Sequence, residues 1–92
     1  MFFVYLLQSK KDGKMYIGVT SDLKKRLQEH NSGKSASTKY RTPFVLIYYE
    51  AYLSFKDAIE REKKLKQFKN SYKELKKRIS YSLSKSKKVV GG

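Results

Sequence analysis

One carboxylate occupies a helix position that the surrounding pattern would normally give to an apolar residue. Over about residues 54–68, apolar side chains recur on one helical stripe, and Glu62 lies on that stripe. A carboxylate there costs free energy unless a cation or hydrogen-bond donors satisfy it. Two interpretations follow: a half-buried ion pair with a neighbouring Lys or Arg, or a ligand for a cation such as Mg²⁺, which needs only one or two protein carboxylates beside phosphate and water.

An earlier helix shows the same feature with two basic side chains. Arg26 and His30 share a stripe with Leu23 and Leu27, at spacings of three, four and seven residues. Both are therefore expected to point toward the sheet or its edge. A guanidinium held there could clamp a phosphate through its planar fork. A lone histidine at such a position is more often a satisfied core residue than a catalyst, so both interpretations of His30 stay open.

Two tyrosines lie on neighbouring predicted strands. The apolar run 2–8 contains Tyr5, and the run 15–19 contains Tyr16; an Asp-Gly pair at 12–13 predicts a hairpin turn between them. Most of the 8 tyrosines are expected to serve packing. Tyrosine is an uncommon general base because its ordinary pKa is about 10. Nearby cations would lower this pKa, and the chain has cations in excess.

The elements that must position these side chains follow the order β-β-α-β-α-α. The expected strands cover about 2–8, 15–19 and 44–49, and the expected helices cover about 22–31, 54–68 and 71–79. Thr20 or Ser21 is expected to cap the first helix, and Ser54 has capping-box spacing to Asp57 for the second. This order indicates an α/β (α+β) sandwich in which helices cover a sheet.

Length and composition limit the chain to one domain. The 92 residues suffice for a single small core, which we place at residues 1–79. Residues 80–92 are rich in Ser and Lys and end in Gly-Gly, so we expect them to form a flexible basic tail.

Residue usage also excludes several kinds of site. The chain has no cysteine and one histidine, which excludes disulfides, thiolate metal sites and a multi-histidine centre, and the simplest location is the reducing cytoplasm. The apolar run at residues 1–7 is too short to span a membrane.

The charge of the chain indicates a polyanionic partner. Lys and Arg number 22 and Asp and Glu number 8, giving a net charge of +14. Nucleic acid is the leading candidate, because counterion release favours many dispersed cations, and an anionic membrane surface is the second. Residues 56–88 contribute +9 of this charge (13 basic and 4 acidic residues). We expect this half to bind the phosphate backbone. Four of its lysines are expected near the cleft that would hold the site: Lys63, Lys66, Lys69 and Lys73.

Taken together, these residues resemble the GIY-YIG nuclease superfamily, in particular its small single-domain, UPF0213-like members. The second signature is intact as Tyr16-Ile17-Gly18, and the first appears as Phe3-Val4-Tyr5, which keeps the Tyr but lacks the Gly and Ile. The similarity covers about residues 2–79, and its other matching positions are 22–33, Tyr40, Pro43, 48–50 and 58–66.

The resemblance implies a three-stranded antiparallel sheet flanked by helices and a metal-dependent phosphodiester hydrolase. Glu62 matches the glutamate that binds a single Mg²⁺ (or Mn²⁺), and Arg26 matches the arginine that steadies the phosphate in the transition state. Tyr5 and Tyr16 match the tyrosines that position or deprotonate the attacking water. His30 matches a position often occupied by His or Tyr. Which of Tyr5, Tyr16 and His30 is the base stays open.

The first functional hypothesis is therefore an endonuclease that hydrolyses DNA by water attack. No residues remain for a separate recognition domain, so little sequence preference is expected, and Tyr40 is a candidate phosphate contact. A second hypothesis is a non-catalytic nucleic-acid-binding module of the same fold, acting as an accessory in DNA repair or processing. A third is a small basic RNA-binding protein with a structural Glu62. We expect no membrane partner; the simplest form is a monomer, although the sequence leaves the oligomeric state open.

Overall fold

The computed structural model describes the backbone of residues 1–91 and the side chains up to Ser86. Its elements follow in chain order: β1 (Phe2–Ser9), β2 (Met15–Thr20), α1 (Leu23–Asn31), the short 3₁₀ helix η1 (Lys39–Arg41), β3 (Phe44–Tyr52), α2 (Phe55–Gln67), α3 (Lys69–Arg78) and α4 (Ser80–Gly91). The expected order β-β-α-β-α-α is confirmed, with one further helix at its end.

The strands form one antiparallel sheet in the order β2-β1-β3. Tyr5 at the centre of β1 lies opposite Gly18 of β2 on one side and Tyr49 of β3 on the other. Gly13 has φ 75° in the turn between β1 and β2, a conformation that favours glycine, so the predicted hairpin is confirmed. The expected three-stranded antiparallel sheet is confirmed as well.

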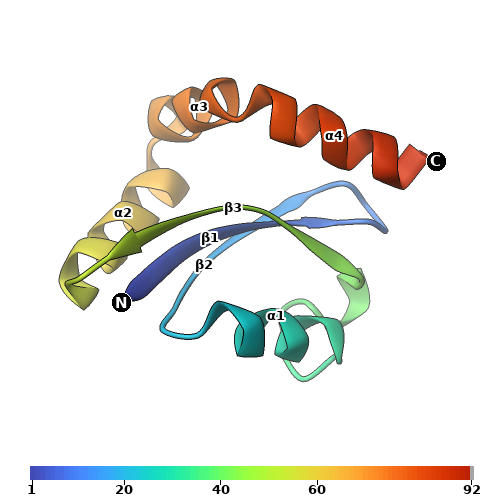
Figure 1. The fold of residues 1–92 in the computed structure, drawn as a ribbon, viewed down its shortest axis with the longest axis horizontal. Helices are drawn as coiled ribbons and strands as arrows, with labels where there is room; N and C mark the ends of the chain where they lie inside the picture. The colour runs from blue at the N-terminus through green and yellow to red at the C-terminus, as the bar shows by residue number, and fades with distance from the viewer. Residues whose placement is uncertain (92) are drawn as a thin grey trace.

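The sheet has a core on each face, because successive residues of β1 point to opposite sides. Val4 and Leu6 pack with side chains of α2 and α3, whereas Tyr5 and Leu7 pack with α1 and the start of β3. Figure 1 shows α1 on one side of the sheet and α3 and α4 on the other. Tyr5 therefore lies on the α1 face, and the helix that carries Glu62 covers the opposite face.

The helix starts differ in detail from those expected. Asp22, rather than Thr20 or Ser21, caps α1, and its side chain accepts a hydrogen bond from the backbone N–H of Lys25 at 3.0 Å. Thr20 instead accepts from the backbone N–H of Asp22 at 3.1 Å and so braces the cap. Ser54 is the N-cap of α2, as predicted, but its side chain makes no capping bond, so the expected capping box is absent.

The chain continues as helix α4 in the region expected to form a flexible tail. Leu83 packs against the core of the α2 and α3 face, and buried Ser86 donates a hydrogen bond to the Gln8 side chain at 2.5 Å. Ser86 thus lies on the sheet-facing side of α4, a helix whose sequence is rich in Ser and Lys. Residue 92 lies outside the described residues, and a domain boundary at residue 79 stays a prediction. No helix within residues 1–91 is both long and apolar enough to cross a membrane.

Candidate active site

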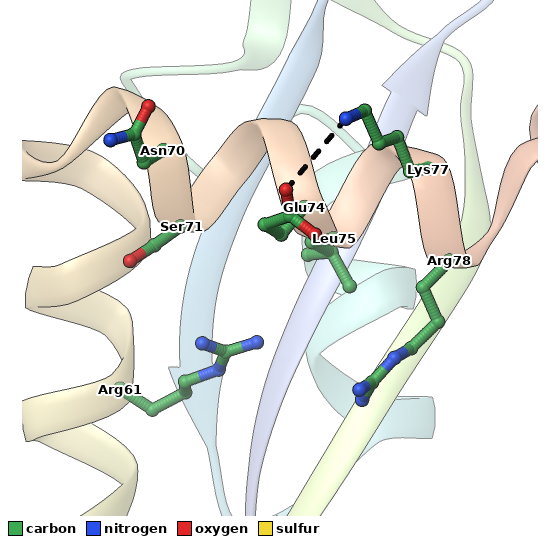
Figure 2. A pocket seen from close by; sticks show the side chains of 7 residues that line it. All are labelled: Arg61, Asn70, Ser71, Glu74, Leu75, Lys77 and Arg78. Atoms are coloured by element: carbon green, nitrogen blue, oxygen red, sulfur yellow. Dashed lines mark ion pairs between the residues drawn. The ribbon is translucent and has the colours of Figure 1, made fainter.

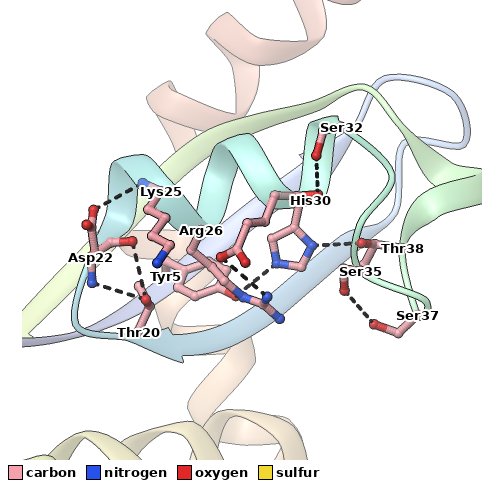
Figure 3. A network of polar contacts seen from close by, with 11 residues as sticks. Tyr5, Thr20, Asp22, Lys25, Arg26, His30, Ser32, Ser35, Ser37 and Thr38 are labelled. Carbon is pink, nitrogen blue, oxygen red and sulfur yellow. Dashed lines mark hydrogen bonds and ion pairs between the residues drawn. The ribbon is translucent and has the colours of Figure 1, made fainter.

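Tyr5 is the centre of a polar cluster between β1 and α1. Its side chain is almost fully buried, and its hydroxyl oxygen lies 3.0 Å from His30 Nε2. Arg26 Nε donates a hydrogen bond to the same oxygen at 3.4 Å. Arg26 and His30 lie one helical turn apart on the sheet-facing side of α1, where the sequence pattern places them (Figure 3). The structure thus brings a phenol, a guanidinium and an imidazole together.

The environment of His30 favours the neutral imidazole. Burial and, to a lesser degree, the positive charge of Arg26 lower the pKa of His30 below its ordinary value. Its second nitrogen, Nδ1, lies 2.7 Å from Oγ1 of Thr38, which is also fully buried and belongs to the loop between α1 and β3. A neutral imidazole can accept a proton at neutral pH.

The Tyr5 phenol is protonated near neutral pH. Burial raises the pKa of Tyr5, and the hydrogen bond from Arg26 opposes this effect without cancelling it. The same hydrogen bond raises the pKa of Arg26. Tyr5 therefore needs a proton acceptor before it can act as a base, and His30 is within reach.

Gly18 provides the space that the Tyr5 hydroxyl occupies. A Cβ atom added at Gly18 would overlap the hydroxyl oxygen and the ring carbon that bears it. The backbone angle φ of Gly18 is ordinary, so the glycine is needed here for close approach and not for its conformation. The glycine of the Tyr-Ile-Gly signature thus lets Tyr5 lie against the backbone of β2.

Tyr16 joins this cluster to the outer edge of β2. Its ring centroid lies 5.0 Å from that of His30 and 6.4 Å from that of Tyr5. Tyr16 also lines a groove of about 330 Å³ together with residues of β2, α2 and α3: Met15, Ile17, Leu65, Lys66 and Tyr72. The aromatic cluster is therefore open toward α2 at this edge.

Glu62 approaches the cluster from α2 without touching it. Its side chain is 20% exposed and pairs with Lys66 Nζ at 3.2 Å, and Lys66 lines the same groove as Tyr16. The negative charge of Glu62 adds a small contribution to the raised pKa of Tyr5. Within the described side chains, no hydrogen bond joins Glu62 to Tyr5, Tyr16 or Arg26.

The donor set fits a cation that keeps most of its own water. Among the side chains that the structure describes, no three His, Cys, Asp or Glu residues gather into a metal-binding group. Glu62 supplies one partly exposed carboxylate, which pairs with Lys66, a residue of the groove beside Tyr16. Mg²⁺ is commonly held by one or two carboxylates, with water and substrate phosphate completing its octahedron, so a single carboxylate suits it.

The predicted nucleic-acid contacts lie outside the cluster. Tyr40 is 75% exposed on η1, and Lys39 Nζ lies 4.9 Å from its ring centroid. The four lysines are exposed on α2 and α3, and only Lys66 lines the groove beside Tyr16: Lys63, Lys66, Lys69 and Lys73. They remain predictions.

A larger groove lies elsewhere, at the junction of α2 and α3. It has a volume of about 590 Å³, and its lining includes Arg61, Arg78 and Lys77 but no tyrosine or histidine (Figure 2). The guanidinium of Arg61 is bound to Glu50 of β3 through contacts of 3.0–3.2 Å. None of the signature residues lines this groove, so size alone does not identify the site.

Two residues of the cluster were not predicted as site residues. Gly18 belongs to the Tyr-Ile-Gly signature, and that motif was a usable signal. Thr38 lies in a polar loop with no periodicity, so nothing local predicts that its hydroxyl is buried against His30.

Comparison with known proteins identifies the family to which this chain belongs. Residues 1–78 match the family of the GIY-YIG catalytic domain. A UPF0213 protein of Streptococcus pneumoniae is 42% identical over 78% of this chain and 73% of its own. A UPF0213 protein of Staphylococcus haemolyticus is 39% identical over 77% of this chain and 87% of its own.

A solved structure shows the same likeness. The solution NMR structure of a UPF0213 protein from Bacillus halodurans has a TM-score of 0.54 at 32% identity, covering 91% of this chain and 94% of that one. The family match spans most of the chain and includes every element that builds the cluster around Tyr5. The chain belongs to the GIY-YIG nuclease superfamily and, within it, to the UPF0213 proteins.

Proposed function

We propose that this protein is an endonuclease that hydrolyses phosphodiester bonds in DNA by water attack, with a divalent cation at Glu62. The observation that carries the proposal is the hydrogen-bonded cluster in which Tyr5 lies between Arg26 and a neutral His30. These groups can perform the two tasks that hydrolysis requires of the protein: removing a proton from water and stabilising negative charge on the phosphate.

Arg26 acts on the phosphate. Its side chain is 33% exposed and its terminal nitrogens make only a distant contact, 3.9 Å, with Glu29, which leaves them available to a ligand while Nε binds Tyr5. A guanidinium in this position donates to the non-bridging phosphate oxygens as charge builds in the transition state. Its bond to Tyr5 fixes the distance between the phosphate and the phenol.

Tyr5 and His30 form the proton-accepting unit. Tyr5 receives the proton of the attacking water on its oxygen as its own phenolic proton passes to Nε2 of His30. Arg26 Nε stabilises the phenolic oxygen during this transfer. Tyr16, at the mouth of the groove, positions the water.

Glu62 would hold the cation, in place of its present partner Lys66. When bound, Mg²⁺ or Mn²⁺ supplies charge stabilisation at the leaving oxygen and polarises the phosphate. The released ammonium group of Lys66 stays beside the groove, where it can contact a neighbouring phosphate.

The exposed lysines of α2 and α3 supply affinity without sequence information. Lys63, Lys69 and Lys73 are exposed, and contacts from such residues to phosphates fix register and orientation only. Weak sequence preference therefore follows, and binding should fall steeply as salt concentration rises.

A nicking assay on supercoiled plasmid and on branched and single-stranded DNA tests the proposal. The protein should cut in Mg²⁺ or Mn²⁺, and EDTA should abolish cutting. Glu62→Gln should abolish cutting while DNA affinity and melting temperature stay near those of the wild type. A matched variant, Glu74→Gln, removes an exposed acid of α3 and should cut normally.

One observation favours a second candidate function, a non-catalytic nucleic-acid-binding module. Glu62 forms an ion pair with Lys66, as a purely structural glutamate would. In that case, wild-type protein would bind every substrate and cut none, and Glu62→Gln would bind equally well. That pair of results would replace the endonuclease by the binding module.

A further inference from the structure

We propose that Thr38 is a positioning residue: its hydroxyl fixes the ring and the tautomer of His30 so that the lone pair of Nε2 faces Tyr5. The catalytic part of this inference rests on the proposed function, because it assigns Nε2 as the acceptor of the Tyr5 proton. The positioning itself is a property of the free protein and can be measured without any substrate.

The contact between Thr38 and His30 has the geometry of a short, buried hydrogen bond. Thr38 and His30 are both fully buried, and Oγ1 lies 2.7 Å from Nδ1. The Thr38 backbone is anchored in turn, because its N–H donates to Ser35 at 3.1 Å and its carbonyl accepts from Arg41 at 2.9 Å. Figure 3 shows Thr38 and Tyr5 on opposite sides of the His30 ring.

Aromatic neighbours confine the imidazole ring. The ring centroids of Tyr16, Phe44 and Tyr5 lie 5.0, 5.9 and 6.0 Å from that of His30. Within this enclosure, the polar partners of the two ring nitrogens are Thr38 and Tyr5. The tautomer of His30 therefore depends on which of these two hydroxyls donates a hydrogen bond to the ring and which accepts one from it.

Hydrogen-bond geometry at Tyr5 selects one tautomer. The Tyr5 oxygen already accepts a hydrogen bond from Arg26 Nε. If Nε2 carried the proton, its N–H group would also point at this oxygen, next to the positive charge of the guanidinium. The favourable arrangement has the phenol donating to Nε2 and Nδ1–H donating to Thr38 Oγ1. The other charged or titratable groups near His30 are Glu29 on α1 and Tyr16 on β2.

Loss of the hydroxyl would remove this selection. Without an acceptor at Oγ1, a proton on Nδ1 would be buried and unpaired, so the proton would move to Nε2 and block the acceptor that faces Tyr5. Partners that orient metal-binding histidines contribute about 10–100-fold to activity, and we expect an effect of similar size here.

The first test is the ¹⁵N spectrum of the histidine side chain in the free protein. The chain has 1 histidine, so its two ring nitrogens give one unambiguous pair of signals. Above pH 7, wild type and Thr38→Ser should be protonated at Nδ1, whereas Thr38→Val should shift toward the Nε2-protonated form. Protonation at Nε2 in the wild type would overturn the inference, even if Thr38→Val did not fold.

The second test is cleavage kinetics. Thr38→Val should lower kcat about 10–100-fold with little change in KM, and Thr38→Ser should restore kcat. Thr42→Val removes another hydroxyl of the same segment, one that makes only a 3.4 Å exposed contact, and should cut like the wild type. Equal kcat in Thr38→Val and wild type would overturn the positioning role. An inactive wild type with the predicted tautomer would overturn the proposed function and leave the positioning intact.

Discussion

Two clusters in this small protein use the same residue types in opposite ways. On the α1 face, Arg26 makes one long hydrogen bond of 3.4 Å to Tyr5, with Tyr16 packed nearby. On the other face, Glu50 receives Arg61 Nε at 3.0 Å and Nη2 at 3.0 Å. The same carboxylate accepts the hydroxyls of Tyr48 at 2.7 Å and Tyr52 at 2.5 Å.

The two clusters contain similar residue types, and they differ in what each arginine and tyrosine binds. Burial and the bonds to Glu50 raise the pKa of Tyr48 and of Tyr52 to about 12. Burial alone would raise the pKa of Glu50, but the bonds from Arg61 and the two tyrosines outweigh it and lower that pKa. We call this the closed cluster, because Arg61, Tyr48 and Tyr52 all bind the one carboxylate of Glu50. We call the cluster around Tyr5 the open cluster, because Arg26 is one-third exposed and makes only one long hydrogen bond and a 3.9 Å contact with Glu29. We propose that this cluster is the one that acts on a substrate.

The largest expected effect concerns the open cluster. Arg26→Ala should lower kcat by about 10²–10³-fold, because it removes a donor aimed at transition-state charge. Stability should change little, since the side chain is one-third exposed and makes only a single long hydrogen bond. Nicking kinetics and a thermal melt measure the two quantities, and a large fall in melting temperature with unchanged kcat would reverse the roles assigned to the two arginines.

The reciprocal change in the closed cluster should affect stability instead. Arg61→Ala leaves the half-buried Glu50 without its cation, and we expect a loss of about 2 kcal/mol, since the pair is partly exposed. For a chain of this size, that corresponds to a fall of roughly 10 °C in melting temperature. Below the melt, cutting should stay near the wild-type rate; loss of cutting without loss of stability would assign Arg61 to the active site.

Gly18→Ala should sharpen the comparison by disturbing only the open cluster. The added methyl group collides with the Tyr5 hydroxyl, and overpacking of this kind costs about 1–3 kcal/mol. Displacing the hydroxyl should also lower kcat. Gly13→Ala is the matched control, since its Cβ meets open space and only the positive φ is strained. An unchanged kcat in Gly18→Ala would show that the position of Tyr5 does not matter.

The closed cluster should also leave a signature at high pH. Tyr48 and Tyr52 have a folded-state pKa of about 12 against an ordinary value of 10.0, so the folded form holds their protons more tightly. Their stabilisation is present below pH 10 and is lost as pH rises toward 12. Denaturant melts over this pH range should show that the double variant Tyr48→Phe with Tyr52→Phe loses less stability than the wild type. The control double variant, Tyr40→Phe with Tyr81→Phe, changes two exposed tyrosines and should lose as much stability over this range as the wild type.

The smallest expected effect concerns the lysines. Lys73→Gln should weaken DNA binding slightly and reduce the slope of log affinity against log salt by about 0.9, the value for one phosphate contact. Lys11→Gln removes one cation from the hairpin turn, far from α3 in sequence, and should leave the slope unchanged. Equal slopes for all three proteins would remove Lys73 from the phosphate-binding surface.

Local sequence patterns predicted the parts of this molecule that depend on local physics. Strand and helix order, the turn at Gly13 and the inward direction of Arg26 and His30 follow from periodicity and turn chemistry. The family that the two tyrosine signatures indicated is confirmed.

The remaining features depend on contacts between distant residues. Thr38 lies in an aperiodic loop, and only the return of the chain to β3 buries its hydroxyl against His30. Helix α4 has the sequence of a polar tail, and its inward contacts come from Leu83 and from Ser86, whose partner Gln8 is 78 residues away. Glu50 and Arg61 lie on separate elements, so no local spacing links them.

The central claim is that Glu62 holds a cation beside the tyrosines of the open cluster. Paramagnetic line broadening by Mn²⁺, in the presence of a DNA oligonucleotide with a non-hydrolysable backbone, measures this directly. We expect the signals of Tyr16, Lys66 and Tyr5 to broaden first in the wild type and to stay sharp in Glu62→Gln. Broadening centred on other acids, or equal broadening in the variant, would contradict the account.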